Sequence, residues 1–249
     1  ERLRYLAQHD ALSNLPNRTH LCEELDRILI NGGSQTRLAV LKIDIDHFSD
    51  LNGWLGLSAG DKVIQIVAER LRAVVDPEDT GNIVARVAGD EFAVVHRKAD
   101  SRASEMLLAA RICRSLARPF NVNNRQVRLS AGIGIALTPA DGDDGERLMK
   151  SATLALAHGK LQGRGRIQFF TPDLDSEMEA RRIVEQAVAN AFATGGFTVH
   201  YQPIYAAGSG ALAGFEALAR LPREDGGLIQ PAVFVPAIER MGMINQLGA

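Results

Sequence analysis

Two acidic residues, Asp90 and Glu91, stand side by side in a cluster of small residues between two apolar runs. The runs, residues 83–87 and 92–96, are rich in β-branched side chains and favour a pair of strands. Gly89 can take the backbone angles that a tight turn needs. The segment is therefore predicted to be a β-hairpin with two carboxylates at its tip. Acidic residues are common at surface turns, so this pattern by itself indicates no more than a turn.

A second acidic segment, upstream, gives the hairpin a chemical interpretation. Residues 38–45 form a nearly continuous apolar run, which is typical of a central strand. Because side chains alternate along a strand, Lys42, Asp44 and Asp46 share one face and the apolar side chains share the other. If this strand lies beside the hairpin, Asp44 and Asp90 meet. Carboxylates that converge without a basic partner repel one another unless a divalent cation such as Mg²⁺ neutralises them, and such a site serves phosphoryl or nucleotidyl transfer.

Hydrophobic periodicity predicts the elements that would position these acids. Ser58 followed by Asp61 resembles a capping box at the start of the clearest helix. Helices are expected at about residues 19–30, 58–75, 103–117 and 145–161, and further strands at 120–122, 126–137 and 167–170. The order strand, helix, hairpin, helix, strand is typical of the split βαβ arrangement in the α+β class. We expect an antiparallel sheet with helices on one side and the acids on an open face.

Composition and charge exclude several classes of protein. The chain has 249 residues, of which 46% are hydrophobic and 23% are charged, which is ordinary for a globular protein. A net charge of −2 and the lack of a basic cluster give no indication of nucleic-acid or membrane contact. No apolar run approaches the ~18 residues that span a bilayer, and no secretory signal is seen. Cys22 and Cys113 have no CxxC partner, so we expect reduced packing residues in a cytoplasmic protein.

An ordered set of motifs resembles the GGDEF family of diguanylate cyclases. The central motif is AGDEF at residues 88–92, within ARVAGDEF. The others follow the order and spacing of the family: DALSNLPNR at 10–18, DIDHF at 44–48, GLSAGD at 56–61, SAGIGIA at 130–136 and GKLQGRGR at 159–166. A lone GDEF would be weak evidence, whereas the ordered set is specific. The resemblance covers about residues 10–170.

The resemblance implies a palm-like split βαβ fold and an enzyme that condenses two GTP molecules into cyclic di-GMP with release of pyrophosphate. Two domains would face each other in a homodimer, each holding one GTP. The cofactor would be Mg²⁺ (or Mn²⁺), held by Asp44, the backbone carbonyl of Ile45, and Asp90. Asp90 or Glu91 would help to deprotonate the attacking 3′-hydroxyl.

The same resemblance implies a set of substrate-binding residues. They are Phe48, Asn52, Asp61, Gly89, Lys160 and Arg164. Asn52 and Asp61 would recognise the guanine edge, Gly89 would let backbone N–H groups approach the nucleotide, and Lys160 and Arg164 would contact phosphates. Each residue also has a simpler interpretation: Asp61 as a helix cap, Asn52 as a turn former, and the two basic residues as partners of a helix C-terminus and solvent.

Departures from the family pattern leave an alternative open. Ala88 stands where the family motif has its first glycine, and Ser49 stands where many members carry a lysine. The DTGN sequence at 79–82 occupies the place of the Arg-x-x-Asp motif of product-inhibited members, so feedback binding of cyclic di-GMP is not expected there. The alternative is a degenerate GTP-binding module that regulates an adjoining domain without turnover, and a third possibility is a scaffold in which neither site works.

The last part of the chain resembles a second family. TVHYQPIY, GFEALARL and FVPAIERMGMINQLG resemble the opening third of an EAL domain, a (β/α)-barrel phosphodiesterase that linearises cyclic di-GMP. By that resemblance Glu216 would be a metal ligand, and Gln202 and Arg220 would contact the dinucleotide. A helix at 176–194 and strands at 198–205 and 213–219 are expected, following a polar hinge.

The predicted organisation is an upstream linker helix at 1–8, a GGDEF domain at 9–171, a linker and helix at 172–195 and the EAL part at 196–249. A complete barrel needs ~200 residues or more, so we expect a fragment that cannot complete a phosphodiesterase site by itself. Cyclic di-GMP would be a partner only through the complete EAL domain. The strands of the fragment are expected to be exposed edges.

Overall fold

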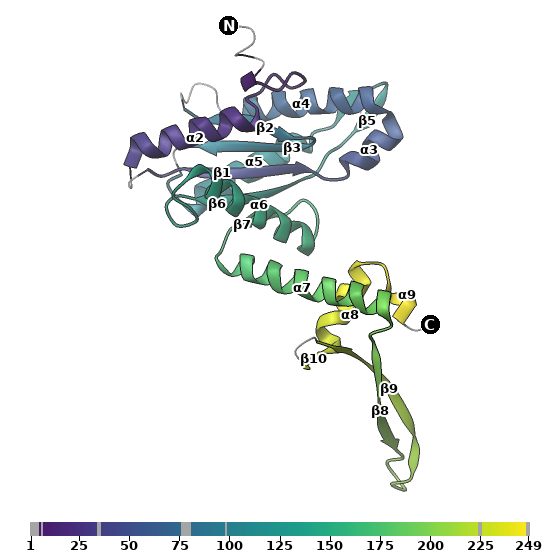
Figure 1. Cartoon of the computed structure of the whole chain (residues 1–249). Helices are drawn as coiled ribbons and strands as arrows, with labels where there is room; N and C mark the ends of the chain where they lie inside the picture. The colour runs from purple at the N-terminus through teal and green to yellow at the C-terminus, as the bar shows by residue number, and fades with distance from the viewer. Residues whose placement is uncertain are drawn as a thin grey trace. The chain divides into compact units, whose positions relative to one another are not determined.

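The computed structural model describes residues 5, 7–33, 36–75, 81–97, 99–223 and 226–247 (Figure 1). It divides into two compact units, Glu1–Leu174 and Asp175–Ala249. Of the predicted upstream linker helix, Tyr5, Ala7 and Gln8 are described, and they are helical. The rest of that prediction lies outside the described residues.

A five-stranded sheet forms the centre of the first unit, in the order β2-β3-β1-β6-β7. Its strands are β1 (Ala39–Ile45), β2 (Ile83–Ala88), β3 (Glu91–His96), β6 (Ala131–Leu137) and β7 (Ile167–Phe169). The central strand β1 is antiparallel to both β3 and β6, which confirms the α+β class and the split βαβ arrangement. The sheet is not wholly antiparallel, because β7 runs parallel to β6. A parallel neighbour requires a crossover, and the helix between these two strands supplies it.

Helices cover both faces of this sheet, so the predicted open face was wrong. On one face α4 (Leu57–Val75) and α5 (Arg102–Leu116) pack over the apolar side of β1. On the other face α2 (Arg18–Gly32) and α6 (Gly145–Gln162) pack over a second apolar cluster that includes Val40. The reason lies in β1, whose second face is apolar at its start and charged only toward its end.

Three smaller features also differ from the sequence prediction. The expected strand at 126–137 is divided into β5 (Arg125–Val127), which pairs with β4 (Phe120–Val122) in a separate hairpin, and β6. A short helix, α3 (Phe48–Leu55), follows β1 and was not predicted. Because α4 begins at Leu57, Ser58 lies inside the helix and is not its N-cap.

The second unit combines a long hairpin with a small helical core. It contains most of α7 (Asp173–Thr194), together with β8 (Thr198–Tyr205), β9 (Leu212–Pro222), β10 (Leu228–Ile229), α8 (Pro231–Arg240) and α9 (Ile244–Leu247). The helix α7 begins earlier than predicted and takes in the end of the expected polar hinge. Val188, Leu221 and Phe234 are buried in the core, whereas every residue of β8 is exposed. Across the described part of the chain, no helix has the length and apolar character needed to cross a membrane.

Candidate functional site

Three carboxylates gather where β1 ends beside the β2–β3 hairpin. The antiparallel register places Asp44 of β1 directly opposite Glu91 of β3. Asp90 precedes Glu91 on the hairpin turn, where Gly89 has a positive φ of 45°. The predicted hairpin and its place beside the acidic strand are therefore confirmed, and these acids share one end of two central strands.

The electrostatics of Asp44 agree with this arrangement. Burial raises the pKa of Asp44, the hydrogen bond and charge of Lys160 oppose the rise, and the negative charges of Asp90 and Glu91 add to it. The Asp44 side chain is 12% exposed. Negative charge is thus concentrated around a poorly solvated carboxylate.

The acids are not without basic partners, which corrects a premise of the sequence analysis. Nζ of Lys160, in the last turn of α6, lies 2.6 Å from Oδ1 of Asp44. Nζ of Lys42, on β1, lies 2.8 Å from Oε2 of Glu91. The alternation of β1 indicated that Lys42 and Asp44 share a face, but only the fold brings α6 across that face.

The donor chemistry of this cluster fits a hard divalent cation. Carboxylate oxygens on adjacent strands are the ligands that Mg²⁺ prefers. Among the described residues, no three His, Cys, Asp or Glu side chains are already assembled as a metal-binding group. The Lys160 side chain is 39% exposed, so it can exchange Asp44 for water or an anion with little loss of packing. Binding of a cation would therefore require side-chain rearrangement within the cluster.

Asp46 anchors the loop that follows α6. Its carboxylate accepts hydrogen bonds from Oγ of Ser130 at 2.7 Å and from the backbone N–H of Gly165 at 2.9 Å. Asp46 is buried, and these hydrogen bonds tie the start of β6 and the loop to the end of β1. The loop it holds carries Arg164, which is exposed, and begins after the helix that carries Lys160.

A second network, which the sequence analysis missed, fixes the hairpin turn. Nε and Nη2 of Arg86 donate to the carbonyl oxygen of Gly89 at 2.9 and 2.7 Å, and Nη1 lies 2.9 Å from Oδ1 of Asp10. Burial raises the pKa of Asp10, but hydrogen bonds from Ser13 and Arg86 outweigh it and hold the pKa below its ordinary value. A Cβ at Gly89 would meet no atom within 4 Å, so the backbone angle explains this glycine. Asp10 lies in the DALSNLPNR motif and Arg86 in the ARVAGDEF motif, and their place in these motifs was the signal from which the sequence could have indicated the network.

The predicted guanine-binding residues lie at the corner between α3 and α4. Asn52 is on α3, and its Oδ1 is buried without a hydrogen-bond partner. The same atom lies 1.8 Å from the position that a Cβ of Gly60 would occupy, so the glycine is required for this packing. Asp61, the next residue on α4, is exposed, and Phe48 at the start of α3 is half-buried against the core.

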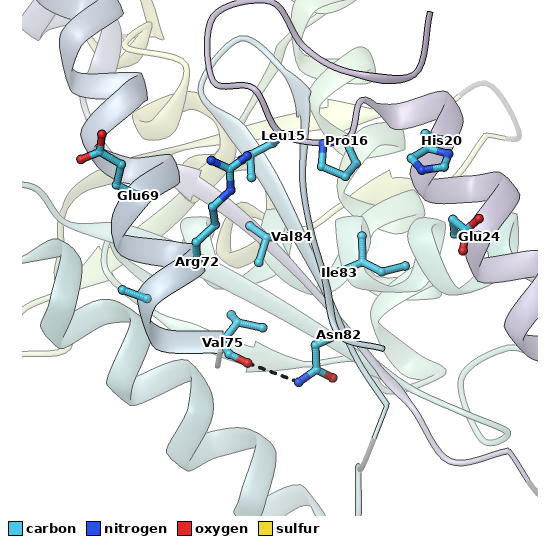
Figure 2. Close-up of a pocket in the computed structure, with 11 residues that line it drawn as sticks. Leu15, Pro16, His20, Glu24, Glu69, Arg72, Val75, Asn82, Ile83 and Val84 are labelled. Atoms are coloured by element: carbon cyan, nitrogen blue, oxygen red, sulfur yellow. Dashed lines mark hydrogen bonds between the residues drawn. The ribbon is translucent and has the colours of Figure 1, made fainter. Parts of the chain in front are cut away.

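A groove of about 680 Å³ lies elsewhere in the first unit, between α2, α4 and the edge strand β2 (Figure 2). Figure 2 shows His20 and Glu24 on one side and Glu69 and Arg72 on the other. The floor is apolar and includes Val84. None of the predicted site residues lines this groove, so it is distinct from the acid cluster.

In the second unit, the three predicted EAL residues share one face of the β8–β9 hairpin. Gln202 lies directly opposite Glu216, and Thr198 lies opposite Arg220. The other face is apolar, with pairs such as Tyr201 with Ala217 and Pro203 with Phe215. Gln202 and Glu216 are exposed and Arg220 is half-buried.

Comparison with known families agrees with this arrangement. The family described as "Diguanylate cyclase, GGDEF domain" matches residues 7–166, and the EAL domain family matches residues 185–249. The chain therefore belongs to the GGDEF family, and an EAL-type segment follows the GGDEF domain.

Curated relatives match almost the whole chain. It is 36% identical over 244 residues to the bifunctional diguanylate cyclase/cyclic di-GMP phosphodiesterase MucR of Pseudomonas aeruginosa, covering 98% of this chain and 35% of that protein. It is 35% identical over 246 residues to the cyclic di-GMP phosphodiesterase NbdA of the same organism, covering 98% of this chain and 31% of that protein. The chain thus spans about a third of the length of these relatives.

Solved structures match the first unit. The isolated GGDEF domain of YfiN (TpbB) from Pseudomonas aeruginosa is 34% identical with a TM-score of 0.65, covering 69% of this chain and 99% of that one. The coiled coil and GGDEF domain of DgcB from Caulobacter crescentus, in complex with c-di-GMP, is 27% identical with a TM-score of 0.61, covering 68% and 88%.

Proposed function

We propose that the first unit binds GTP with a divalent cation and condenses two GTP molecules into cyclic di-GMP when two copies meet. The observation that carries the proposal is the register of β1 against β3, which sets Asp44 opposite Glu91 with Asp90 on the adjoining turn. Family membership and the names of relatives such as MucR support cyclic di-GMP signalling as the context.

The carboxylates of Asp44 and Asp90 and the carbonyl of Ile45 would hold Mg²⁺ (or Mn²⁺). The bound cation would neutralise phosphate charge during nucleotidyl transfer. Asp90 or Glu91 would accept the proton of the 3′-hydroxyl that attacks the α-phosphate. Attack forms the new phosphodiester bond and breaks the bond to pyrophosphate.

The phosphates would be bound by basic residues from the end of α6. Lys160, paired with Asp44 in the free chain, would turn toward a phosphate oxygen when the cation takes its place. Arg164 lies exposed on the loop anchored by Asp46 and would make a second contact. Gly89 keeps the hairpin turn free of a side chain beside the nucleotide.

Guanine would be recognised at the α3–α4 corner. The Asp61 carboxylate can accept from the ring N–H and the amino group of guanine, a pairing that adenine cannot offer. Oδ1 of Asn52 is an unused acceptor buried against Gly60, so the Asn52 side chain would turn outward to reach the base, and Phe48 would supply an apolar contact. We therefore infer selectivity for GTP over ATP.

A second candidate function is a GTP-binding regulatory module without turnover. Ala88 favours it, because this residue pairs opposite Glu91 in the hairpin register and adds a methyl group beside the acid cluster. In that case GTP binding would act on the EAL-type segment. There Gln202 and Arg220 would contact cyclic di-GMP and Glu216 would ligate a metal as part of a complete EAL domain.

The test is turnover by the purified chain. The chain is incubated with GTP and Mg²⁺ while pyrophosphate and cyclic di-GMP are measured, alongside Asp90→Asn and the control Asp143→Asn, an exposed acid outside the cluster. We expect product from the wild type and the control, and a loss of at least ~100-fold in Asp90→Asn. GTP binding without product would favour the regulatory module, and no guanine-nucleotide binding would contradict both candidates.

A further inference from the structure

Lys42 is an unusual residue for the centre of a sheet. It is 3% exposed on β1, between β3 and β6. Lysine is rarely buried to this extent, because an ammonium group taken out of water is strongly destabilising unless it is paired. Lys42 lies outside the GGDEF-family motifs of this sequence, the nearest of which is DIDHF at 44–48.

The neighbouring strands leave space for its side chain and supply its partner. Lys42 pairs with Ala93 of β3 on one side and Gly134 of β6 on the other. A Cβ at Gly134 would lie 2.1 Å from the carbonyl oxygen of Ala152 on α6, so this position must stay small. The Lys42 ammonium reaches along β3 to Oε2 of Glu91 at 2.8 Å.

The two lysines of the cluster differ in their freedom to move. The Lys160 side chain is 39% exposed, so it can leave Asp44. The Lys42 side chain is only 4% exposed, so it has no solvated position to move to without disrupting the strand packing. Its positive charge is therefore a permanent part of the acid cluster, whereas that of Lys160 is exchangeable.

We propose that Lys42 is a fixed internal cation of the acid cluster, which holds Glu91 in an ion pair and lowers the affinity of the cluster for divalent metal ions. The inference rests on the proposed function in treating the cluster as a cation site. Asp44 and Asp90 then remain as the carboxylates available to the metal. Lys42 is a positioning residue for Glu91, and it sets how much divalent cation the site needs.

The experiment measures cation binding without nucleotide. Mn²⁺ is titrated into the full chain, and free Mn²⁺ is followed by electron paramagnetic resonance. The variants are Lys42→Met, Lys42→Gln, which keeps a polar group toward Glu91, and the control Lys150→Met, an exposed lysine of α6. Circular dichroism melting curves show which variants are folded.

We expect both Lys42 variants to bind Mn²⁺ on the order of tenfold more tightly than the wild type, because a repelling charge has been removed and Glu91 has been released. Lys150→Met should bind as the wild type does. In Lys42→Met/Glu91→Gln, the gain should be largely lost.

A purely structural ion pair would change the melting curve and leave Mn²⁺ affinity unaltered, and that result would overturn the inference. Failure of both Lys42 variants to fold would assign the residue to the fold and overturn it as well, as would the absence of Mn²⁺ binding in wild type and variants alike. Because no GTP is present, the outcome does not depend on turnover. A chain that makes no cyclic di-GMP can still show the affinity change, and an active chain can fail to show it.

Discussion

The acid cluster of the first unit and the polar face of the β8–β9 hairpin in the second unit are built on the same local plan. In each, an antiparallel register sets two candidate site residues opposite one another: Asp44 with Glu91, and Gln202 with Glu216. The surroundings differ. Asp44 is buried below a helix and paired with a lysine, whereas Gln202 and Glu216 are exposed.

The difference shows that the placement of these side chains and the environment around them have separate causes. Strand register alone brings the side chains together in both regions. Of these two regions, the one with a raised carboxylate pKa and partly buried ion pairs is the acid cluster, where packing on both faces of the sheet removes water. The acid cluster therefore has the buried charges and the shifted pKa that are typical of a functional site. In the described part of the chain, the candidate residues of the hairpin remain open to solvent.

The largest expected contrast comes from removing one aromatic side chain in each region. Phe92→Ala should lower the free energy of unfolding by about 3–5 kcal/mol, because Phe92 is fully buried beneath the hairpin turn. Phe215→Ala should change it by less than about 0.5 kcal/mol, because this ring is 59% exposed. Urea unfolding measures both. A loss in Phe215→Ala as large as that in Phe92→Ala would mean that the hairpin is packed in solution.

A smaller loss is expected when the turn network is cut. Arg86→Met should lower the free energy of unfolding by about 1.5–3 kcal/mol, since it removes charged hydrogen bonds to Gly89 and Asp10. The pKa of Asp10 in the folded chain lies below the ordinary value of 3.8. The ionised carboxylate therefore stabilises the fold fully at a pH above 3.8, and this stabilisation is lost as the pH falls through the folded pKa. Stability curves from pH 2 to 7 should therefore fall less steeply at the acid end in Arg86→Met. Arg220→Met, which removes a hydrogen bond to the carbonyl oxygen of Ala219, serves as the hairpin control.

Asp44→Asn should raise stability and abolish the proposed condensation of GTP. The folded pKa of Asp44 is raised, so its charged form is unfavourable in the folded state and folding is favoured as the pH falls through that pKa. At neutral pH the amide should raise Tm by about 2–4 °C, and the gain should vanish below the ordinary pKa of 3.8. Glu216→Gln, an exposed acid in the hairpin, should leave Tm unchanged. A fall in Tm for Asp44→Asn would show that its ion pair with Lys160 outweighs the cost of burial and the repulsion from Asp90 and Glu91.

The smallest effect on stability is expected from the apolar face of the hairpin. Tyr201→Lys should leave Tm unaltered, since Tyr201 is 68% exposed. It should instead lower self-association in sedimentation velocity, because the substitution places a charge on an exposed apolar strand face. His200→Lys, on the opposite face, is the control. Equal self-association in wild type and Tyr201→Lys would mean that this face has no tendency to associate.

The sequence by itself determined the elements whose signals are local. The hairpin with its turn at Gly89 needed only two β-branched runs and a glycine. The alternation of β1 put Lys42 and Asp44 on one face, and β8 was predicted with the bounds that it has in the structure. These features depend on backbone preferences and on a period of two, and both can be recognised within a short window of residues.

Only the tertiary structure decided what stands opposite each acid. The pairing of Lys42 with Glu91, the approach of Lys160 to Asp44 and the anchoring of the loop after α6 by Asp46 join residues far apart in the chain. The covering of the second sheet face by α2 and α6 is of the same kind. Periodicity shows which face a side chain takes. The partner that it meets there depends on the order of the strands and on the packing of the helices. Both are set by the free energy of the whole fold, which no short window of sequence contains.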